Sequence, residues 1–568
     1  MQKTLARAAH RGLAAALLAV AAAPAAGQFV NPPPPAAYAL RNVTVVAPDG
    51  ARTTGLDLVV RGERIVALGR GLTVPPDAEV LAGDTLLVYP GIVDAWGAVT
   101  FSFPRDSLDR SKLRSWDPPR SVHGFLPRRR VFDVLAPAAD ELVALRQKGV
   151  VAVAVHPTEG LMPGRGALLL LRAGDPAGAL ASTGATGATG AAAARLAIEP
   201  VLGPVLTFRG TRGFYPATGM AVPGFFRQAF LDATRAAQVA QATPRGAVPP
   251  PFDADHAVLQ EVLAGSVPAF FVADDVEHIR HVLRFADEYR IRPVVLGGAE
   301  AWQVAPELKR RDIPVLVSLD FPEPVRWKPD AKPDSAPLPA AVRERRDLEA
   351  RYANAGRLAA AGVRVALTSG GKAETDIRAG VRKAIEHGLS EGDALRALTL
   401  TPARLFGYER LATVAQGAPA TFVVTDGPLF EERTRVRYTF VEGVLEPGAE
   451  PDTASAAQSR DTARSVAGSW AFEAKASVGD AISGTMTLAQ DGENVSGSAE
   501  LGELGTAAIR SGTHSGRRIT LTLSVTQGGQ TLSIELNGTV EGDTMSGTGT
   551  GPTGSFEWTA TRTPGGAR

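Results

Sequence analysis

Short apolar segments separated by turns make up the chain after residue 38. Alternating apolar and polar positions at Leu40–Val46, Leu56–Arg61 and Arg64–Leu68 are typical of strands in an antiparallel sheet. From Pro90 to about Phe406, short Val- and Leu-rich runs alternate with amphipathic helical stretches. Strands that are apolar on both faces and separated by helices predict parallel βαβ units, and about 315 residues of them suit a (β/α)8 TIM-like barrel. A doubly wound sheet is the alternative.

Several segments fall outside this alternation. Residues 181–194 form a Ser/Thr/Gly/Ala run that predicts a surface loop, and the proline-rich Phe321–Pro339 follows a predicted strand, where barrel loops shape the mouth. The polar residues 449–465 have the composition of a linker. Residues 466–568 contain alternating runs divided by Gly-containing turns, which predict an antiparallel β barrel or sandwich of about eight strands.

The first residues predict a secretory signal peptide over 1–27. A basic start precedes an uncharged run at Gly12–Ala23, and small residues come just before Gln28. A proline-rich spacer, residues 28–37, follows. The apolar run is too short to span a bilayer, so we expect an exported protein, periplasmic or extracellular, with no transmembrane segment. The absence of cysteine excludes both a lipoprotein anchor and disulfides.

The net charge limits the classes of partner that we expect, and the length limits the number of domains. The formal net charge is +1, and cleavage before Gln28 removes three basic residues and no acidic one, which gives −2. Such a balance provides no long-range field, so we expect no nucleic-acid partner and no attraction to anionic lipid. At 568 residues the chain is too long for one core, and two to four domains are expected. The oligomeric state stays open.

Three segments resemble the amidohydrolase superfamily, in particular imidazolonepropionase-like and composite-domain metal-dependent hydrolases. Tyr89–Ala95 resembles the first barrel strand, which normally reads Pro-Gly-Leu-Ile-Asp followed by x-His-x-His. Leu389–Gly407 resembles the last barrel helices, and Val414–Val424 the strands that rejoin the N-terminal sheet. The resemblance covers about residues 38–448. It implies a barrel over 90–411, a composite β-sandwich from 38–89 with 412–448, and hydrolysis of non-peptide carbon–nitrogen bonds with zinc or iron.

The positions that match the family's metal ligands hold other residues. The two histidines after strand 1 correspond to Trp96 and Ala98, and the later strands offer Val272 and Gly297. The place of the catalytic aspartate falls in a segment where Ser369 carries no carboxylate. Zinc and iron need several N, O or S donors, which these side chains lack. We therefore expect no metal cofactor and Trp96 to fill the vacated space, and enzymatic activity stays open.

The remaining polar residues at predicted strand ends are candidates for a pocket. His156 directly follows the second strand, and it either faces the pocket or is a satisfied buried histidine. Strand ends converge on one mouth of such a barrel, although short acids also cap helices. The carboxylates placed there are Asp94, Asp274 or Asp275, Glu300 and Asp320.

Three further features are open to a functional interpretation. Arg227 lies in a segment that resembles amidohydrolase-like proteins with an eroded site; it is either a clamp for a ligand carboxylate or half of a surface ion pair, for instance with Asp232. The backbone around Ser369 can bind an anion at a helix start. His278 and His281 have helical metal-binding spacing but are expected on a solvated surface.

Three functions follow as hypotheses. The first is a small-molecule pocket retained on the amidohydrolase plan after loss of metal catalysis. The second is a metal-independent, glycosidase-like hydrolase with paired carboxylates, in which Glu300 acts with Asp274 or Asp320. The third is a non-catalytic binding protein with the C-terminal β domain as its interaction module. The catalytic candidates are Asp274, Glu300 and His156, and the pocket candidates are Asp94, Trp96, Asp320, Arg227 and Ser369.

Overall fold

The computed structural model describes residues 37–81, 86–104, 106–172, 196–244, 246–248, 251–322, 339–449 and 465–563, with short gaps in the last range. The predicted signal peptide, residues 28–36 of the spacer, the 181–194 loop, residues 323–338 and residues 450–464 of the linker lie outside these residues. The chain divides into two compact units, Met1–Ala449 and Glu450–Arg568.

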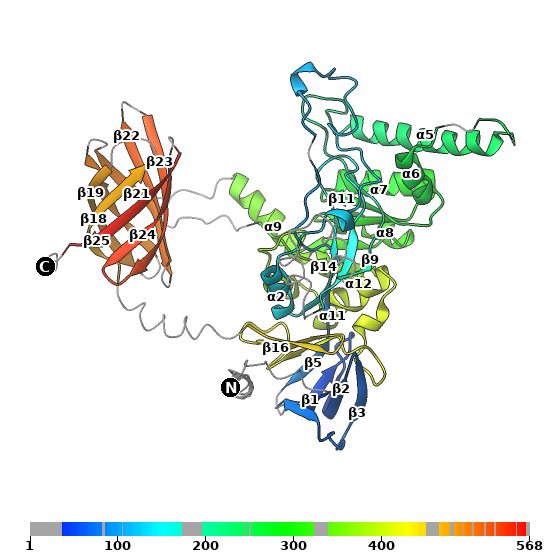
Figure 1. Ribbon diagram of the computed structural model, residues 1–568, viewed down its shortest axis with the longest axis horizontal. Coiled ribbons are helices and arrows are strands. Elements are labelled where there is room, and N and C mark those ends of the chain that lie inside the picture. The colour runs from blue at the N-terminus through cyan, green and yellow to red at the C-terminus, as the bar shows by residue number, and fades with distance from the viewer. Residues whose placement is uncertain are drawn as a thin grey trace, which may run out of the picture. The chain divides into compact units, whose positions relative to one another are not determined.

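A composite sheet occupies one end of the first unit (Figure 1). Its strands run in the order β17-β16-β15-β5-β1-β2-β3, with β4 beside β1. β15 pairs antiparallel with β5, so segments from before and after the barrel join in one sheet. The strands are β1 (Ala37–Val46), β2 (Arg52–Arg61), β3 (Arg64–Gly69), β4 (Ala78–Leu81), β5 (Leu87–Pro90), β15 (Phe422–Thr425), β16 (Val436–Val441) and β17 (Val444–Pro447).

Eight strands surround the interior of a TIM-like barrel. Side chains from all eight belong to one buried apolar cluster. The strands are β6 (Ile92–Asp94), β7 (Val150–Val155), β8 (Ala167–Leu170), β10 (Val205–Thr207), β11 (Ala269–Ala273), β12 (Pro293–Gly297), β13 (Val315–Ser318) and β14 (Val365–Thr368). Hydrogen bonding divides them into two sheets, β6-β7-β8 with β9 (Ala197–Glu199), and β10 to β14. Backbone bonds at the seams join these sheets, from Gly371 N to Trp96 O at 2.8 Å and from Val205 N to Gly164 O at 3.0 Å.

The barrel departs from the all-parallel pattern at its third strand. β8 runs antiparallel to β7, and β9 runs antiparallel to β8. Only residues 156–166 connect β7 to β8. A parallel connection needs a crossover of a dozen or more residues, usually a helix, so this short connection enforces a reversal.

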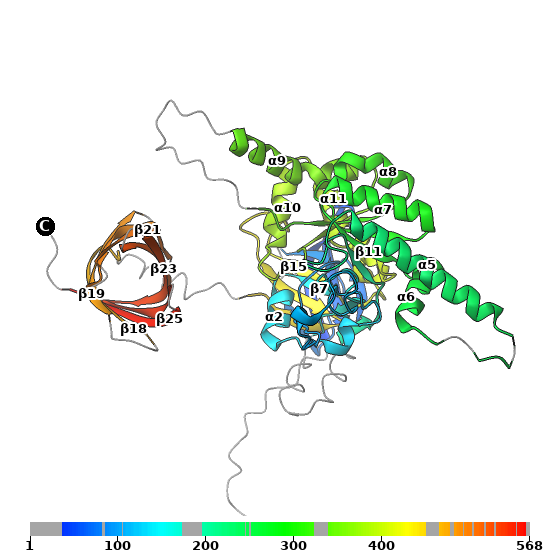
Figure 2. The ribbon, with the colours of Figure 1, turned by 90° about the horizontal axis from the view of Figure 1, so that it is seen from above.

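Helices pack around the outside of the strands, as Figure 2 shows from above. Their inner faces share a second apolar cluster with the outward side chains of the strands, including Phe226, Phe230 and Phe285. The helices are α2 (Ala139–Gln147), α5 (Ala221–Ala242), α6 (Ala254–Leu263), α7 (Val276–Tyr289), α8 (Ala305–Arg310), α9 (Pro339–Ala360), α10 (Ile377–Glu386), α11 (Glu391–Leu398) and α12 (Leu400–Leu405), with 3-10 turns at Arg110–Lys112, Val131–Val134, Ala301–Val304 and Glu409–Ala412.

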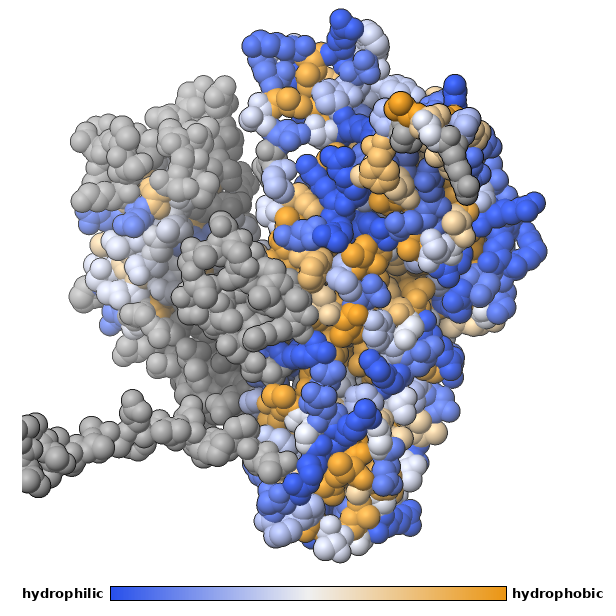
Figure 3. Space-filling view, turned by 45° about the vertical axis from the view of Figure 1, so that its right-hand side comes forward, coloured by the Kyte–Doolittle hydropathy of each residue, from blue (hydrophilic) through white to orange (hydrophobic). Residues whose placement is uncertain are grey.

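The outer face of the first unit mixes hydrophilic and apolar side chains, as seen in Figure 3. In the described part of the chain, no helix combines the length and apolar character needed to cross a bilayer.

The second unit is a closed antiparallel barrel of eight strands. Its interior is filled by apolar side chains, among them the fully buried Trp470 and Trp558. Each indole N–H donates to a backbone carbonyl, at Val466 and Thr548 respectively. This confirms the barrel expected from the hairpin pattern. The strands are β18 (Gly468–Ala476), β19 (Ile482–Asp491), β20 (Asn494–Glu500), β21 (Thr506–Ser515), β22 (Arg518–Gln527), β23 (Gln530–Glu541), β24 (Thr544–Gly551) and β25 (Gly554–Arg562).

Candidate functional site

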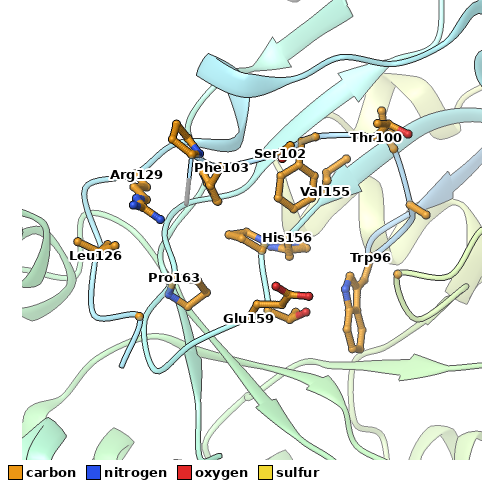
Figure 4. Close-up of a pocket in the computed structure, with 18 of the residues that line it drawn as sticks. Trp96, Thr100, Ser102, Phe103, Leu126, Arg129, Val155, His156, Glu159 and Pro163 are labelled. Carbon is orange, nitrogen blue, oxygen red and sulfur yellow. The ribbon is translucent and has the colours of Figure 1, made fainter. Parts of the chain in front are cut away.

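A cavity of about 890 Å3 opens beyond the carboxyl ends of β6 and β7. Three stretches of chain form most of its wall, residues 96–110, 121–129 and 155–163, and residues 370–373 complete it. Figure 4 shows His156 near the centre of this wall, with Trp96 and Arg129 to its two sides in that view. The carboxyl ends of barrel strands are where such folds place their binding sites.

Asp94 and Ser369 form a buried polar seam between β6 and β14. The Ser369 hydroxyl donates to Asp94 Oδ2 at 2.6 Å, and the backbone N–H groups of Ser369 and Trp96 each donate to Oδ1 at 3.2 Å. Burial raises the pKa of Asp94, while these hydrogen bonds act in the opposite direction. Asp94 and Ser369 lie behind the cavity wall and join two strands, so the Ser369 hydroxyl is committed to Asp94.

Trp96 forms part of the cavity wall and is partly buried. Its indole packs against the cluster inside the barrel. Gly371 lies beside it with φ of 75°, and a Cβ at that position would approach Trp96 Nε1 to 2.8 Å. The expectation of a mostly buried Trp96 is therefore met only in part, because one portion of the indole packs on the core while another portion faces the cavity.

His156 is 5% exposed and lines the cavity. Its Nε2 lies 3.2 Å from the Ala95 carbonyl, and its ring packs at 4.5 Å from the Phe270 ring. Among the described residues, the buried Nδ1 has no hydrogen-bond partner. Burial lowers the pKa of His156 to about 4, against the opposing bond to Ala95. The imidazole is therefore neutral at neutral pH, with Nε2 donating and Nδ1 left as an acceptor.

The carboxylates predicted at the mouth form helix caps and an ion pair. Glu300 Oε2 accepts from Val276 N at 3.0 Å, which caps α7. Asp275 also caps α7, through His278 N at 2.8 Å. Asp320 forms an ion pair with Lys372 at 2.5 Å.

Asp274 is the exposed member of this group, and its carboxylate lies against Gly297. Desolvation raises its pKa, with Arg351 opposing. Because the residue is more than a third exposed, water screens much of this effect. None of these four acids lines the cavity described above.

Arg227 does not contact the cavity. Its Nε donates to the Glu288 carboxylate at 2.9 Å, which links α5 to α7, and its guanidinium lies 5.3 Å from the Phe285 ring centroid. The ligand-clamp interpretation is therefore corrected to an ion pair between helices, with Glu288 in place of the suggested Asp232. His278 and His281 pack against the Phe208 ring on the outside of the barrel.

The residues present do not fit the zinc or iron that the resemblance implies. Trp96, Ala98, Val272 and Gly297 stand at the matched ligand positions and offer no side-chain donor. Both oxygens of the nearby Asp94 carboxylate already accept hydrogen bonds from the protein. Throughout the described ranges, no group of three or more His, Asp or Glu side chains could hold a metal ion.

Sequence reasoning missed the charged residues that do line the cavity. Asp106, Arg110, Arg129 and Glu159 lie on connecting segments that carry no strand or helix periodicity, and Glu141 lies in the first turn of α2. The one available signal was the concentration of basic residues between 101 and 130.

The amidohydrolase family model matches residues 325–460, less than half of the chain. An amidohydrolase from Thermotoga maritima is similar in structure, with 20% identity, a TM-score of 0.57, and coverage of 72% of this chain and 99% of that one. A prolidase complexed with N-methylphosphonate-L-proline (18% identity, TM-score 0.42, coverage 73% and 100%) and the β-aspartyl dipeptidase of Fervidobacterium islandicum AW-1 (14%, 0.37, 73% and 96%) are more distant. No curated protein sequence matches.

Likeness at 20% identity speaks for the fold alone, and the T. maritima structure shares the barrel over nearly its whole length. The family match covers the last barrel helices and the strands that return to the composite sheet. The match and the shared barrel together support the placement of this chain in the amidohydrolase superfamily of hydrolases.

Proposed function

We propose that this protein is an exported member of the superfamily that binds a small molecule in the cavity beside β6 and β7 and has lost standard metal catalysis. One observation carries the proposal: the cavity lies beyond the carboxyl ends of β6 and β7 and is lined by Trp96 and Ala98, while the other matched ligand positions hold Val272 and Gly297. An open site with convergent polar groups is the usual place of a ligand.

The environment of His156 supports binding over water activation. A metal ligand needs a free nitrogen lone pair directed at the ion, and Nε2 is engaged by the Ala95 carbonyl. Nδ1 is unpartnered within the described structure but has negligible exposure. The imidazole therefore serves as a neutral, rigid part of the wall.

Paired-carboxylate hydrolysis has less support. Glu300 caps α7 and Asp320 is paired with Lys372, so neither is poised as a free acid or base. For the third hypothesis, a non-catalytic binding protein with the C-terminal β domain as its interaction module, the described residues offer no ligand site inside that barrel, because its own apolar side chains fill it.

Elemental analysis of the purified mature protein tests the loss of metal. We expect substoichiometric zinc, iron and manganese, and no gain of hydrolysis when Trp96→His and Ala98→His are combined, because Val272 and Gly297 still lack donors. One tightly held ion per chain that resists a chelator would overturn the proposal. The mass of the secreted protein tests the export step, with cleavage before Gln28 expected.

Ligand binding tests the cavity itself. A small-molecule library screened by thermal shift should contain compounds that stabilise the wild type and lose that effect in Trp96→Ala. Trp116→Ala is the matched control, because Trp116 is 66% exposed and does not line the cavity. Equal responses of both variants to every ligand would place binding elsewhere.

A further inference from the structure

The segment that forms one wall of the cavity is strongly basic in an otherwise balanced chain. Residues 101–130 contain eight basic and three acidic residues, whereas the whole chain has a net charge of +1. A concentration of one sign of charge around a cleft favours ligands that carry the opposite charge.

Four of these basic side chains, Lys112, Arg120, Arg128 and Arg130, have carboxylate partners in the described part of the chain. Arg120 pairs with Asp253 at 2.9 Å and with the buried Asp255 at 2.8 Å. Arg130 pairs with Asp133 at 2.7 Å. These pairs hold the segment in place and leave little charge for a ligand.

Arg129 and Arg110 differ from them. Both line the cavity, and within the described residues neither forms an ion pair. The Arg129 guanidinium lies 5.4 Å from the Phe103 ring centroid, and that of Arg110 lies 5.4 Å from Phe214. Stacking on an aromatic ring leaves the edge N–H groups of a guanidinium available to a carboxylate.

A negative charge faces the same cavity from another segment. Glu141 also lines it, but its carboxylate is taken by the N–H groups of Thr100 and Ala138. Asp106 lines the cavity too, but this carboxylate belongs to the basic segment 101–130 and offsets part of its charge. Glu159 is exposed and, in the described part of the chain, has no ion-pair partner. In Figure 4 the Glu159 carboxylate and the Arg129 side chain lie on different sides of His156.

Backbone hydrogen bonds anchor the segments that carry both charges. Arg129 N donates to Leu126 O at 3.0 Å, and its carbonyl accepts from Arg165 N at 2.8 Å. Next to Glu159, the Thr207 hydroxyl donates to Gly160 O at 2.6 Å. Two opposite charges that lie on anchored segments and do not neutralise each other can bind a partner with complementary charges.

We propose that the cavity binds a small zwitterion with an apolar part, with its carboxylate at Arg129, its ammonium group at Glu159, and its apolar part against Trp96. This inference rests on the proposed role of the cavity as a binding site. The His156 ring, which lines the same cavity, is neutral at neutral pH and adds no charge.

Four probes test the carboxylate and the ammonium group of the ligand separately. They are L-phenylalanylglycine, its N-acetyl form without the ammonium group, its C-terminal amide without the carboxylate, and the doubly blocked neutral compound. Binding of each to the full chain is measured by titration calorimetry, in the wild type and in Arg129→Gln and Glu159→Gln. Arg114→Gln and Glu344→Gln are the matched controls, since both residues are exposed and lie outside the cavity wall.

A charged hydrogen bond is worth about tenfold to a hundredfold in affinity. We expect Arg129→Gln to weaken the two carboxylate-bearing probes by that factor and to leave the amide unchanged. Glu159→Gln should weaken only the two probes that carry the ammonium group. The controls should bind all four like the wild type.

The outcomes distinguish this inference from the proposed function. If all four probes bind equally and the variants have no effect, the cavity binds small molecules but the zwitterion is wrong. If L-phenylalanylglycine does not bind at millimolar concentration, the zwitterion is also overturned. A tightly bound metal ion would instead refute the metal-free function, whatever the probes do. Circular dichroism confirms that each variant is folded.

Discussion

Two substitutions of Asp94 separate the stability that its hydrogen bonds contribute from the stability that its buried charge costs. The residue is 1% exposed, and Oδ1 accepts from the N–H groups of Trp96 and Ser369. Asp94→Asn keeps that oxygen. Its new NH2 group faces the Ser369 hydroxyl, which can accept the bond and donate instead to Trp96 O, 3.3 Å away. Asp94→Ala removes every acceptor.

The two variants therefore differ in expected stability. Asp94→Ala leaves two buried N–H groups without an acceptor, at about 1–3 kcal/mol each, so the free energy of unfolding of the first unit should fall by about 2–6 kcal/mol. Asp94→Asn should lower it by less than about 1 kcal/mol at pH 7, or raise it, because a desolvated charge is removed while the bonds remain.

The slope of the unfolding free energy against pH tests the same reasoning independently, through its sign. Because burial raises the pKa of Asp94, the folded protein binds more protons than the unfolded chain between the ordinary carboxyl pKa of about 4 and the raised value. The contribution of Asp94 to the unfolding free energy is thus greatest below this window and falls as the pH rises through it. Asp94→Asn lacks this slope, so the variant should gain on the wild type as the pH rises.

Hydrogen exchange in a urea series, read by mass spectrometry from peptides within residues 37–449, measures the first unit separately. Asp77→Asn is the control, because the hydrogen bond from Arg61 lowers the pKa of this exposed carboxyl and gives a slope of opposite sign. If Asp94→Asn destabilises the unit as much as Asp94→Ala at pH 7, the charge itself is stabilising and the reasoning is refuted.

Three further outcomes are expected. Residues 465–563 alone should unfold cooperatively by circular dichroism, and a disordered fragment would contradict the domain boundary. In that fragment, Trp470→Ala should lower the free energy of unfolding by about 3–5 kcal/mol, as for other buried aromatic residues. In urea unfolding, Trp96→Ala should cost less than Trp470→Ala, because Trp96 is only partly buried; an equal cost would refute this. Burial lowers the pKa of His123 and His156 to about 4, so the unfolding free energy should fall as the pH drops from about 6.5 towards 4, where only the unfolded chain takes up protons. NMR titration midpoints near 6.5 for both histidines in the folded protein would contradict this, because the slope would then vanish.

The sequence was informative where local pattern decides the structure. The Tyr89–Ala95 segment contains β6, and Leu389–Gly407 contains α11 and α12, because strand composition, a Ser390 cap and helical periodicity act within a few residues. The C-terminal hairpins follow from alternation and from turns that contain glycine. Each of these features depends on neighbours in the chain.

The remaining features depend on residues far apart in the chain. Glu300 belongs to one strand end but caps a helix that begins at Val276, and Arg227 finds its partner Glu288 sixty-one residues away. The apolar run at Ala167–Leu170 predicts a buried strand but not whether that strand runs parallel or antiparallel to its neighbour. Arg129 and Glu159 lie on irregular segments, and only tertiary packing brings them to one cavity.

The reversed strand β8 changes how the barrel can fold. A parallel barrel has no pairing between strands close in sequence, so each contact requires closure of a long loop. Here β7 and β8 pair across residues 156–166, and both faces of this hairpin are buried, with Ala154 and Leu168 inside the barrel and Val155 and Leu169 beneath the helices. Hairpins form within microseconds, far faster than distant strands meet. The hairpin therefore supplies a local nucleus on which the slower, long-range strands can assemble, and its amides should be the first of the barrel to become protected in pulse-labelled refolding.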